Sequence, residues 1–230
     1  MPLFNPPDFF PRRISQYVPA MRYASDVNMH GGIARISFGA PAVSTAAAQL
    51  FAAAHDVSAA GTLLAADMDY TEADAPWGRN VYVDLSGAGT GNVDFYGWDY
   101  LGQYMIERVA LNGATAVQGL RAFKHMHKIV YPTVGAVTLE TGFGTKLGLP
   151  YKAIKVISEE QDGAPKGTLG TLADPVLTDP QVITTGDPRG TYIPNTTLNG
   201  TRVVTATFLF DNTVNSSNNG GLHGITPYAG

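Results

Sequence analysis

Short apolar or alternating runs separated by Gly-rich turns dominate the middle of this 230-residue chain, from 77 to 151. In the run 81–85, Val and Leu alternate with Tyr and Asp, which places the apolar side chains on one face of a strand. The Gly-rich segment 86–91 predicts a turn, and 93–96 opens the returning strand. Asn-Gly at 112–113 is a second hairpin signal. This spacing predicts an all-β fold, an antiparallel β-sandwich of the jelly-roll-like kind.

A chain of this length can form one all-β domain, and we expect a single β-sandwich domain over 41–230. An extended N-terminal arm, 1–40, precedes it. The Ala-rich segment 46–54 is the candidate helix, capped by Ser44 or Thr45, and an Ala-rich strand is the alternative. Further strands are expected at 105–111, 123–131, 136–140, 151–157 and 202–211, the last pairing with strands far earlier in the chain.

The arm is unusual for a segment that cannot form regular structure. Five of its first nineteen residues are proline, which excludes a helix or a central strand there. It is nevertheless rich in aromatic side chains, which are scarce in disordered tails. It also carries several Arg residues, and aromatic and Arg side chains are both enriched at protein interfaces. The arm either docks onto another chain or packs along its own domain. We predict the former, with an interface formed by Phe9, Phe10, Arg12, Arg13 and Tyr17.

Gly, Pro, Thr and Asp are frequent from 158 to 200, with turn signals at 174–175, 179–180 and 186–190. This composition predicts a long loop excursion. Long loops usually carry a function or lie bound to something. The segment is therefore a second candidate for contact with a partner.

The composition limits the partners and the chemistry. Charged residues make up 15% of the chain, against about 25% in average globular proteins. Low charge fits a surface partly covered by partners, and it equally fits a polar surface of Thr, Asn and Ser. The net charge of −4 gives no general attraction to nucleic acid. Cysteine is absent, which excludes disulfides, thiolate metal sites and a cysteine nucleophile.

The sequence also bears on where the chain is made. The N-terminus lacks the apolar stretch of a signal peptide. No apolar run approaches the roughly 18 residues that span a membrane. We therefore expect synthesis in the cytoplasm and no membrane partner.

Motifs for catalysis or cofactor binding are weak. His125 and His127 share a face of an expected strand, but no spacing supplies a third metal ligand, and Lys124 and Lys128 beside them repel a cation. The Gly-rich stretches lack the helix and spacing of a nucleotide-binding loop. There is no Gly-x-Ser-x-Gly elbow and no His-Glu-x-x-His motif. We expect no catalytic, cofactor or metal site, and no enzyme activity.

Two further clusters have plain structural interpretations. An acidic patch precedes the first clear strand and comprises Asp67, Asp69, Glu72 and Asp74. We expect a solvated loop there, with a weak calcium site as the alternative. A group of aromatic residues follows, at Tyr96, Trp98, Tyr100 and Tyr104. These can form a contact surface for carbohydrate or protein, but packing in the core or on a sheet face is favoured.

Several short segments of the sequence, called phrases below, together carry a resemblance to a known family. They are 76–81 (Pro-Trp-Gly-Arg-Asn-Val), 97–103 (Gly-Trp-Asp-Tyr-Leu-Gly-Gln), 111–119, 122–124, 146–151, 186–192 (Gly-Asp-Pro-Arg-Gly-Thr-Tyr) and 222–224. They cover about 75–230, while 1–40 has no motif that matches. On these phrases the chain resembles tailed-bacteriophage virion structural proteins of the capsid decoration, or cement, type.

The resemblance implies a function. Such a protein binds the outer surface of the capsid lattice and stabilises the head without chemistry. Its partners would be the major capsid protein and further copies of itself, as a homodimer or homotrimer, and its location would be the virion, on the capsid surface. One alternative is a tail or fibre component that binds a host receptor through 158–200. The other is a sugar-directed depolymerase with clustered carboxylates.

Overall fold

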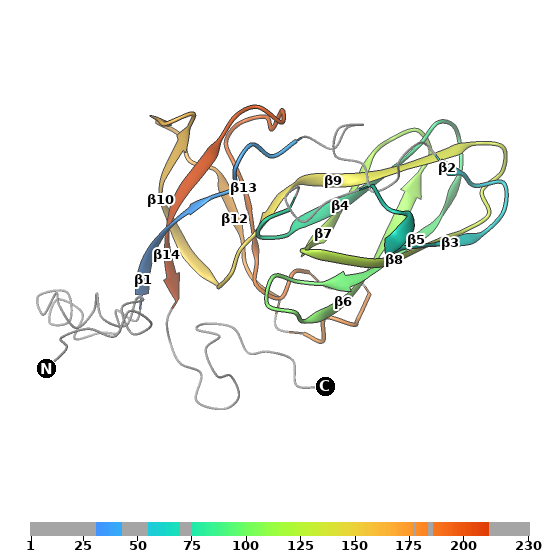
Figure 1. Ribbon diagram of the computed structural model, residues 1–230, viewed down its shortest axis with the longest axis horizontal. Helices are drawn as coiled ribbons and strands as arrows, with labels where there is room; N and C mark the ends of the chain where they lie inside the picture. The colour runs from blue at the N-terminus through green and yellow to red at the C-terminus, as the bar shows by residue number, and fades with distance from the viewer. Residues whose placement is uncertain (1–30, 43–54, 70–74, 177, 184–185, 212–230) are drawn as a thin grey trace, which may run out of the picture.

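The fold is all-β, as the sequence predicts (Figure 1). In the computed structural model the described residues are 31–42, 55–69, 75–176, 178–183 and 186–211. Every strand pair among them is antiparallel, and none of their helices is long and apolar enough to cross a membrane. The elements are β1 (Gly31–Ser37), β2 (His55–Asp56), β3 (Gly61–Leu64), the 3-10 turn η3 (Ala65–Asp67), β4 (Arg79–Leu85), β5 (Thr90–Trp98), β6 (Tyr104–Asn112), β7 (Val117–Phe123), β8 (His125–Tyr131), β9 (Thr138–Gly148), β10 (Ala153–Gln161), β11 (Ala164–Pro165), β12 (Thr171–Ala173), β13 (Thr191–Ile193) and β14 (Val204–Asp211).

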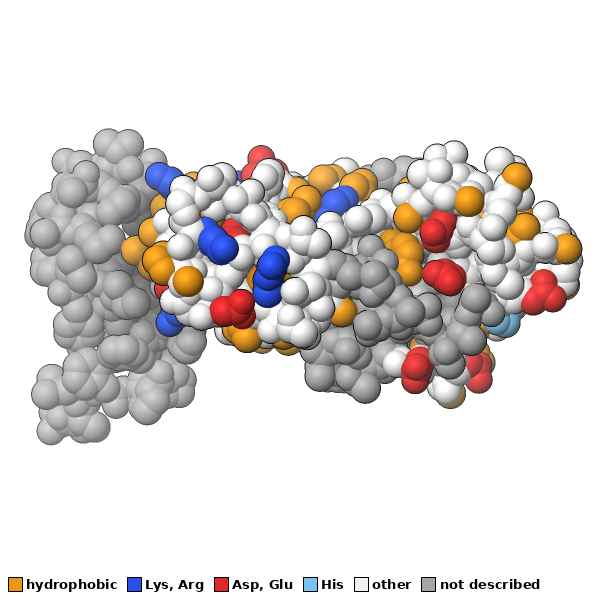
Figure 2. Space-filling model, turned by 90° about the horizontal axis from the view of Figure 1, so that it is seen from above, with side chains coloured by type: hydrophobic (Ala, Val, Ile, Leu, Met, Phe, Trp, Pro, Cys, Tyr) orange, Lys and Arg blue, Asp and Glu red, His pale blue; other side chains and the backbone are white. Residues whose placement is uncertain are grey.

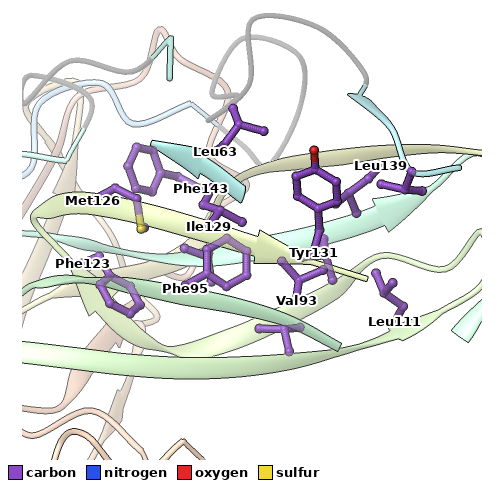
Figure 3. Close-up of a cluster of buried hydrophobic side chains, with 14 of the residues drawn as sticks. Leu63, Val93, Phe95, Leu111, Phe123, Met126, Ile129, Tyr131, Leu139 and Phe143 are labelled. Atoms are coloured by element: carbon purple, nitrogen blue, oxygen red, sulfur yellow. The ribbon is translucent and has the colours of Figure 1, made fainter. Parts of the chain in front are cut away.

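Two facing sheets form the larger lobe, which lies on the right in Figure 1. One sheet has the order β3-β8-β5-β6, and the other contributes β9-β4-β7 with β2 paired to β9. Alternation along β5 turns Val93 and Phe95 inward, where both are fully buried. Side chains of both sheets meet in this core (Figure 3). The alternating runs of the sequence therefore build a sandwich.

A smaller lobe is built on the sheet β1-β14-β10-β11, which we call the small-lobe sheet. Its inner face packs against β12, β13 and the end of β9. At its centre the rings of Phe208 and Tyr192 meet edge to face with centroids 5.1 Å apart. Strand β9 joins the lobes, because Phe143 lies in the larger core and Leu147 in the smaller one. The buried core therefore consists of two clusters along an elongated body (Figure 1).

The expected strands at 105–111, 151–157 and 202–211 correspond to β6, β10 and β14. The strand expected at 136–140 is longer in the structure, because β9 continues through its glycines to Gly148. These glycines mark close approaches rather than a turn. A Cβ on Gly144 would lie 2.4 Å from the side-chain oxygen of Asn80, and one on Gly148 would lie 2.4 Å from the Trp77 carbonyl oxygen.

The structure corrects the domain boundary. Strand β1, within the range expected to be an arm, pairs with β14 over seven residues, and the Phe38 side chain is buried in the small lobe. The domain therefore begins by Gly31 rather than after residue 40. The short run Gly31–Ser37 contains two glycines and one Arg, so its alternation is too weak to be recognised before its partner is known. The candidate helix 46–54 lies outside the described residues.

Candidate functional site

Part of the segment 158–200 lies across the larger lobe and forms the most elaborate polar site of the described residues. We call 178–183 and 186–190 the strap. The chain leaves the small lobe after β12 and returns to it at β13. In between, the strap covers the edge of β6, because Ile106 N–H donates to the Pro180 carbonyl at 3.0 Å and Arg108 N–H to the Ile183 carbonyl at 3.2 Å. An edge strand is thereby protected by the chain's own loop.

Arg121 on β7 holds the strap in place. Its side chain is fully buried, at an inward position between Gly119 and Phe123. The guanidinium donates to three strap carbonyls, those of Pro180, Val182 and Gly186, and to the Ile106 carbonyl of β6. A planar guanidinium with five donors suits such convergent acceptors. One side chain therefore satisfies backbone groups of two strands and a loop.

Glu107 on β6 is a buried acid whose charge acts on this cation. Its carboxylate accepts hydrogen bonds from the backbone N–H groups of Leu120 and Arg121, the latter at 3.2 Å. The approach needs a glycine opposite, because a Cβ on Gly119 would lie 2.5 Å from the carboxylate. Burial raises the pKa of Glu107 to about 7, although the two backbone bonds act to lower it. The carboxylate thus accepts the hydrogen bonds that backbone carbonyls of a neighbouring strand would otherwise accept from this edge of β7.

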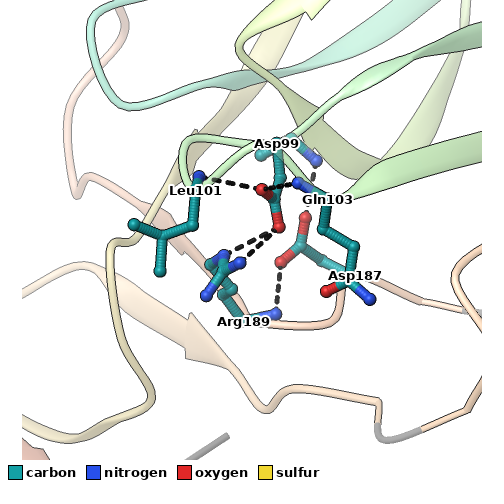
Figure 4. Close-up of polar contacts among 6 residues, drawn as sticks. Asp99, Leu101, Gln103, Asp187 and Arg189 are labelled. Carbon is teal, nitrogen blue, oxygen red and sulfur yellow. Dashed lines mark hydrogen bonds and ion pairs between the residues drawn. The ribbon is translucent and has the colours of Figure 1, made fainter. Parts of the chain in front are cut away.

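Asp187, Arg189 and Asp99 fasten the second part of the strap (Figure 4). Asp187 accepts from Ala122 N–H at 2.7 Å and from Arg189 N–H at 2.8 Å. The Arg189 guanidinium lies 2.7 Å from the Asp99 carboxylate, and both side chains are 3% exposed. Asp99 also accepts from the N–H groups of Leu101 and Gln103 in the turn after β5. Burial raises the pKa of Asp187 to about 6.

These charged side chains act as one structural unit, which we call the clasp: Asp99, Glu107, Arg121, Asp187 and Arg189. All are at most 6% exposed. Each carboxylate accepts backbone N–H groups or an Arg, so each is used to connect parts of the chain. The described residues contain no group of three or more His, Asp or Glu side chains that could hold a metal ion. A groove of about 280 Å³ lies beside Glu107 between β6 and β7.

The buried acids give stability a defined pH dependence. The unfolded carboxyl of Glu107 titrates near its ordinary value of 4.5, while the folded one titrates near 7. Between these values the folded chain retains a proton that the unfolded chain has lost, so the free energy of unfolding should fall as pH rises from about 5 to 8. A shift of this size corresponds to about 3 kcal/mol. Urea denaturation at pH 5, 6, 7 and 8 measures it.

Glu107→Gln is the control for this prediction, because an amide does not titrate. The variant should show a shallower decline between pH 5 and 8 than the natural chain. The remaining slope has the same sign, since burial also raises the pKa of Asp187. A natural chain whose stability rises over this range, or a variant with an unchanged slope, would contradict the assignment.

A second buried acid fixes the part of 158–200 that lies in the small lobe. Glu159, 1% exposed, accepts from Gly170 N–H at 2.9 Å, from Asn195 N–H at 3.1 Å and from the Tyr192 hydroxyl. Burial and the nearby Glu159 raise the pKa of Tyr192. The predicted long loop excursion, 158–200, is thus partly buried and partly exposed. Residues 187–192 are all buried, whereas 162–168 are exposed.

The interface residues predicted from the sequence, Phe9, Phe10, Arg12, Arg13 and Tyr17, lie outside the described residues. His125 and His127 lie on β8 on either side of the buried Met126, and the His127 ring packs on Trp98 with centroids 5.5 Å apart. Asp67 accepts from Leu64 N–H at 3.4 Å. Of the acidic patch, Glu72 and Asp74 are not among the described residues.

The aromatic cluster lies on a sheet face rather than in the core. Trp98 packs on Tyr104 with ring centroids 5.5 Å apart, and the Lys128 ammonium lies 4.3 Å from the centre of the Tyr96 ring. All three rings are partly exposed on the outer face of β5 and β6. The fourth aromatic, Tyr100, instead packs on Trp77 at 4.6 Å. The sequence favoured packing in the core or on a sheet face, and the three strand residues lie on a sheet face.

Comparisons with known proteins supply no relative. No family model matches the chain, no curated protein matches it, and no solved structure matches it.

Sequence reasoning overlooked the clasp, although a signal was present. Glu107 lies between the inward apolar positions Met105 and Val109 of β6. Arg121 likewise lies two residues before the buried Phe123 on β7. Charges at inward positions of a sheet are rare unless they are paired. Such interruptions of the apolar pattern predict buried polar contacts, but they do not name the partners.

Proposed function

We propose that this chain is a non-enzymatic capsid decoration protein of a tailed bacteriophage, bound to the outer surface of the capsid lattice. One observation carries the proposal beyond the sequence phrases themselves. The phrases 97–103, 122–124 and 186–192 meet in the clasp through Asp99, Ala122, Asp187 and Arg189. If the phrases that carry the resemblance came from an enzyme, their residues would be expected to surround a site where a substrate reacts. In this chain they instead form hydrogen bonds and an ion pair that connect parts of the fold.

The phrases 76–81, 111–119 and 146–151 also meet one another. Asn80, in the phrase 76–81, accepts from Lys146 N–H of the phrase 146–151 at 2.8 Å. Its amide donates to the Gly119 carbonyl at 2.9 Å. Arg79 beside it donates to the carbonyls of Ala42 and Gly144. A two-lobed body whose buried charged side chains make internal contacts suits a protein that must fit a repeating lattice, where recognition comes from shape and surface.

The proposed partners are the major capsid protein and further copies of the chain, with the arm as the main contact. The body has its own buried clusters. A Phe left in water forgoes about 1.5–3 kcal/mol of burial. The aromatic side chains of the arm therefore favour docking on a surface outside their own segment, and repeated attachment of this kind does not need a catalytic group.

Removal of residues 1–20 tests this assignment. We expect the shortened chain to fold with a nearly unchanged melting temperature, because the described body has two buried clusters of its own. It should bind less to isolated capsids that lack the protein, as measured by co-sedimentation. A variant with Phe9 and Phe10 replaced by Ser should show the same loss. A large drop in melting temperature would mean that the arm belongs to its own core, and undiminished binding would place the contact elsewhere.

The alternative, a tail or fibre component that binds a host receptor, has one observation in its favour. The outer face of β5 and β6 carries the partly exposed rings of Tyr96, Trp98 and Tyr104, and such rings suit contacts with sugars or proteins. The burial of 187–192 counts against a receptor-binding role for that part of 158–200. The position of the protein in the particle separates the two proposals.

A further inference from the structure

We propose that the outer face of the small-lobe sheet receives the N-terminal arm, residues 1–30, of a second copy of this chain. This inference rests on the self-association part of the proposed function and deepens it, because it names the surface that receives the arm; it is tested without a capsid. It rests on the apolar character of the face, on the open edge of β1, and on the place where the arm joins the body.

The outer face of the small-lobe sheet is apolar at several exposed positions. Ile33 on β1 is 44% exposed, and Ile154 and Ile157, at the two register shifts of β10, are 53% and 45% exposed. Leu209 of β14 lies directly opposite Ile33 and is half-buried, with the exposed Lys155 of β10 on its other side. Figure 2 shows hydrophobic side chains gathered at this end of the body. Clusters of exposed apolar side chains on a sheet usually mark an interaction site.

Strand β1 is also an open edge. It pairs with β14 on one side, and no strand within the described part of the chain pairs with its other side. Edge strands are commonly protected by Pro, by bulges or by several charges. Strand β1 has neither Pro nor a bulge, and its one charge, Arg35, is engaged by Glu160 across the outer face at 2.5 Å. The edge is therefore suited to the addition of an extended segment.

The arm joins the body at this same sheet. It leads directly into Gly31, the first residue of β1, which pairs with Asp211 at the end of β14. The arm supplies aromatic side chains that can cover the exposed apolar residues of the face. They are Phe4, Phe9, Phe10, Tyr17 and Tyr23. Aromatic side chains on an extended segment are effective anchors for an apolar sheet face.

Chain length favours a second copy as the source of the arm. Phe9 lies 22 residues before Gly31, and a Pro-rich segment advances about 3.1 Å per residue. Phe9 can therefore reach roughly 70 Å from its own β1, whereas a strand of seven residues spans about 23 Å. The Pro residues at 2, 6, 7, 11 and 19 favour an extended backbone in the first part of this segment. The aromatic residues can therefore reach the sheet of a neighbouring copy.

The absence of natural cysteine permits a direct test by disulfide trapping. Full-length chains with Phe10→Cys and others with Ile33→Cys, distinguished by mass, are mixed and mildly oxidised. We expect a disulfide-linked pair containing one chain of each kind, in large excess over the pair formed when Leu64→Cys, exposed on the larger lobe, replaces Ile33→Cys. Equal trapping with both partners would overturn the proposal. In the double variant, Phe10→Cys with Ile33→Cys, a link within one chain as the main product would overturn it as well.

The oligomeric state provides an independent measurement. Light scattering after size-exclusion chromatography should show a multimer for the natural chain and for Leu64→Glu. Ile33→Glu, and the chain without residues 1–20, should be monomers with an unchanged far-ultraviolet circular dichroism spectrum. A natural chain that is monomeric at all concentrations, or an Ile33→Glu variant that remains a folded multimer, would contradict the proposal. Neither measurement uses capsids, so a failure here is distinct from a failure of the proposed function.

Discussion

Replacing Arg121 with Met should lower the free energy of unfolding by about 3–5 kcal/mol. The change removes the donors to the carbonyls of Ile106, Pro180, Val182 and Gly186. Buried carbonyls that lose their partners carry the full cost of desolvation. It also removes a positive charge that acts on the buried carboxylates of Glu107 and Asp187. Urea denaturation at pH 7 measures the loss.

Arg108→Met is the matched control for this substitution. Arg108 follows Glu107 on β6 but points outward, where it pairs with Asp94 in a partly exposed ion pair. Removing such a pair has little effect on stability. Limited proteolysis should in addition cut the strap in Arg121→Met faster than in the control, because the strap loses three of its attachments. Equal stability of the two variants would show that Arg121 does not hold the strap.

The second large effect is expected for Arg189→Met, again about 3–5 kcal/mol. The substitution leaves the Asp99 carboxylate, 3% exposed, without the guanidinium that lies 2.7 Å away. Asp99 retains the two backbone N–H groups of its turn, which lessens the loss without removing it. The measurement is the denaturant midpoint at pH 7.

A double-mutant cycle isolates the pair. Asp99→Asn combined with Arg189→Met should be less destabilising than the sum of the single changes, because the double variant contains no unpaired buried charge. Arg35→Met, at the exposed pair with Glu160, serves as the control and should change stability little. Additive effects of Asp99→Asn and Arg189→Met would mean that the two side chains do not interact in the folded chain.

The β-fold was accessible from the sequence because its signal is local. Alternation in 81–85 and 93–96 requires only that one face of each strand be buried, and β4 and β5 occur there. The late strand is likewise present as β14, and its predicted pairing with earlier strands is confirmed by its contacts with β1 and β10. These predictions needed no knowledge of which residues meet.

The clasp could not be assembled from the sequence because its contacts are non-local. Asp99 and Arg189 are separated by 90 positions, and Ala122 and Asp187 by 65. Periodicity reports that a residue faces inward, but it does not report the residue opposite. The same limit explains why β1 was not predicted as a strand. It is a strand because it pairs with β14, and that pairing joins the two ends of the described chain.

The burial of 187–192 within the predicted loop excursion 158–200 was not predicted, for a related reason. Gly, Pro and Asp in 186–190 do signal a turn, and the segment does lack long strands. Composition alone cannot distinguish a solvated turn from one whose carboxylate accepts N–H groups of the body, as Asp187 does from Ala122. The burial of this turn depends on its contacts with distant residues, such as Ala122, which the local sequence does not indicate.

The most direct test of a capsid-decorating role is the number of copies of this chain per virion. Quantitative mass spectrometry of purified particles, with the major capsid protein as internal standard, provides it. The proposal predicts a fixed ratio to the major capsid protein, set by the lattice, and the same ratio in heads separated from tails. A handful of copies that fractionate with tails, or a complete absence from purified particles, would contradict it.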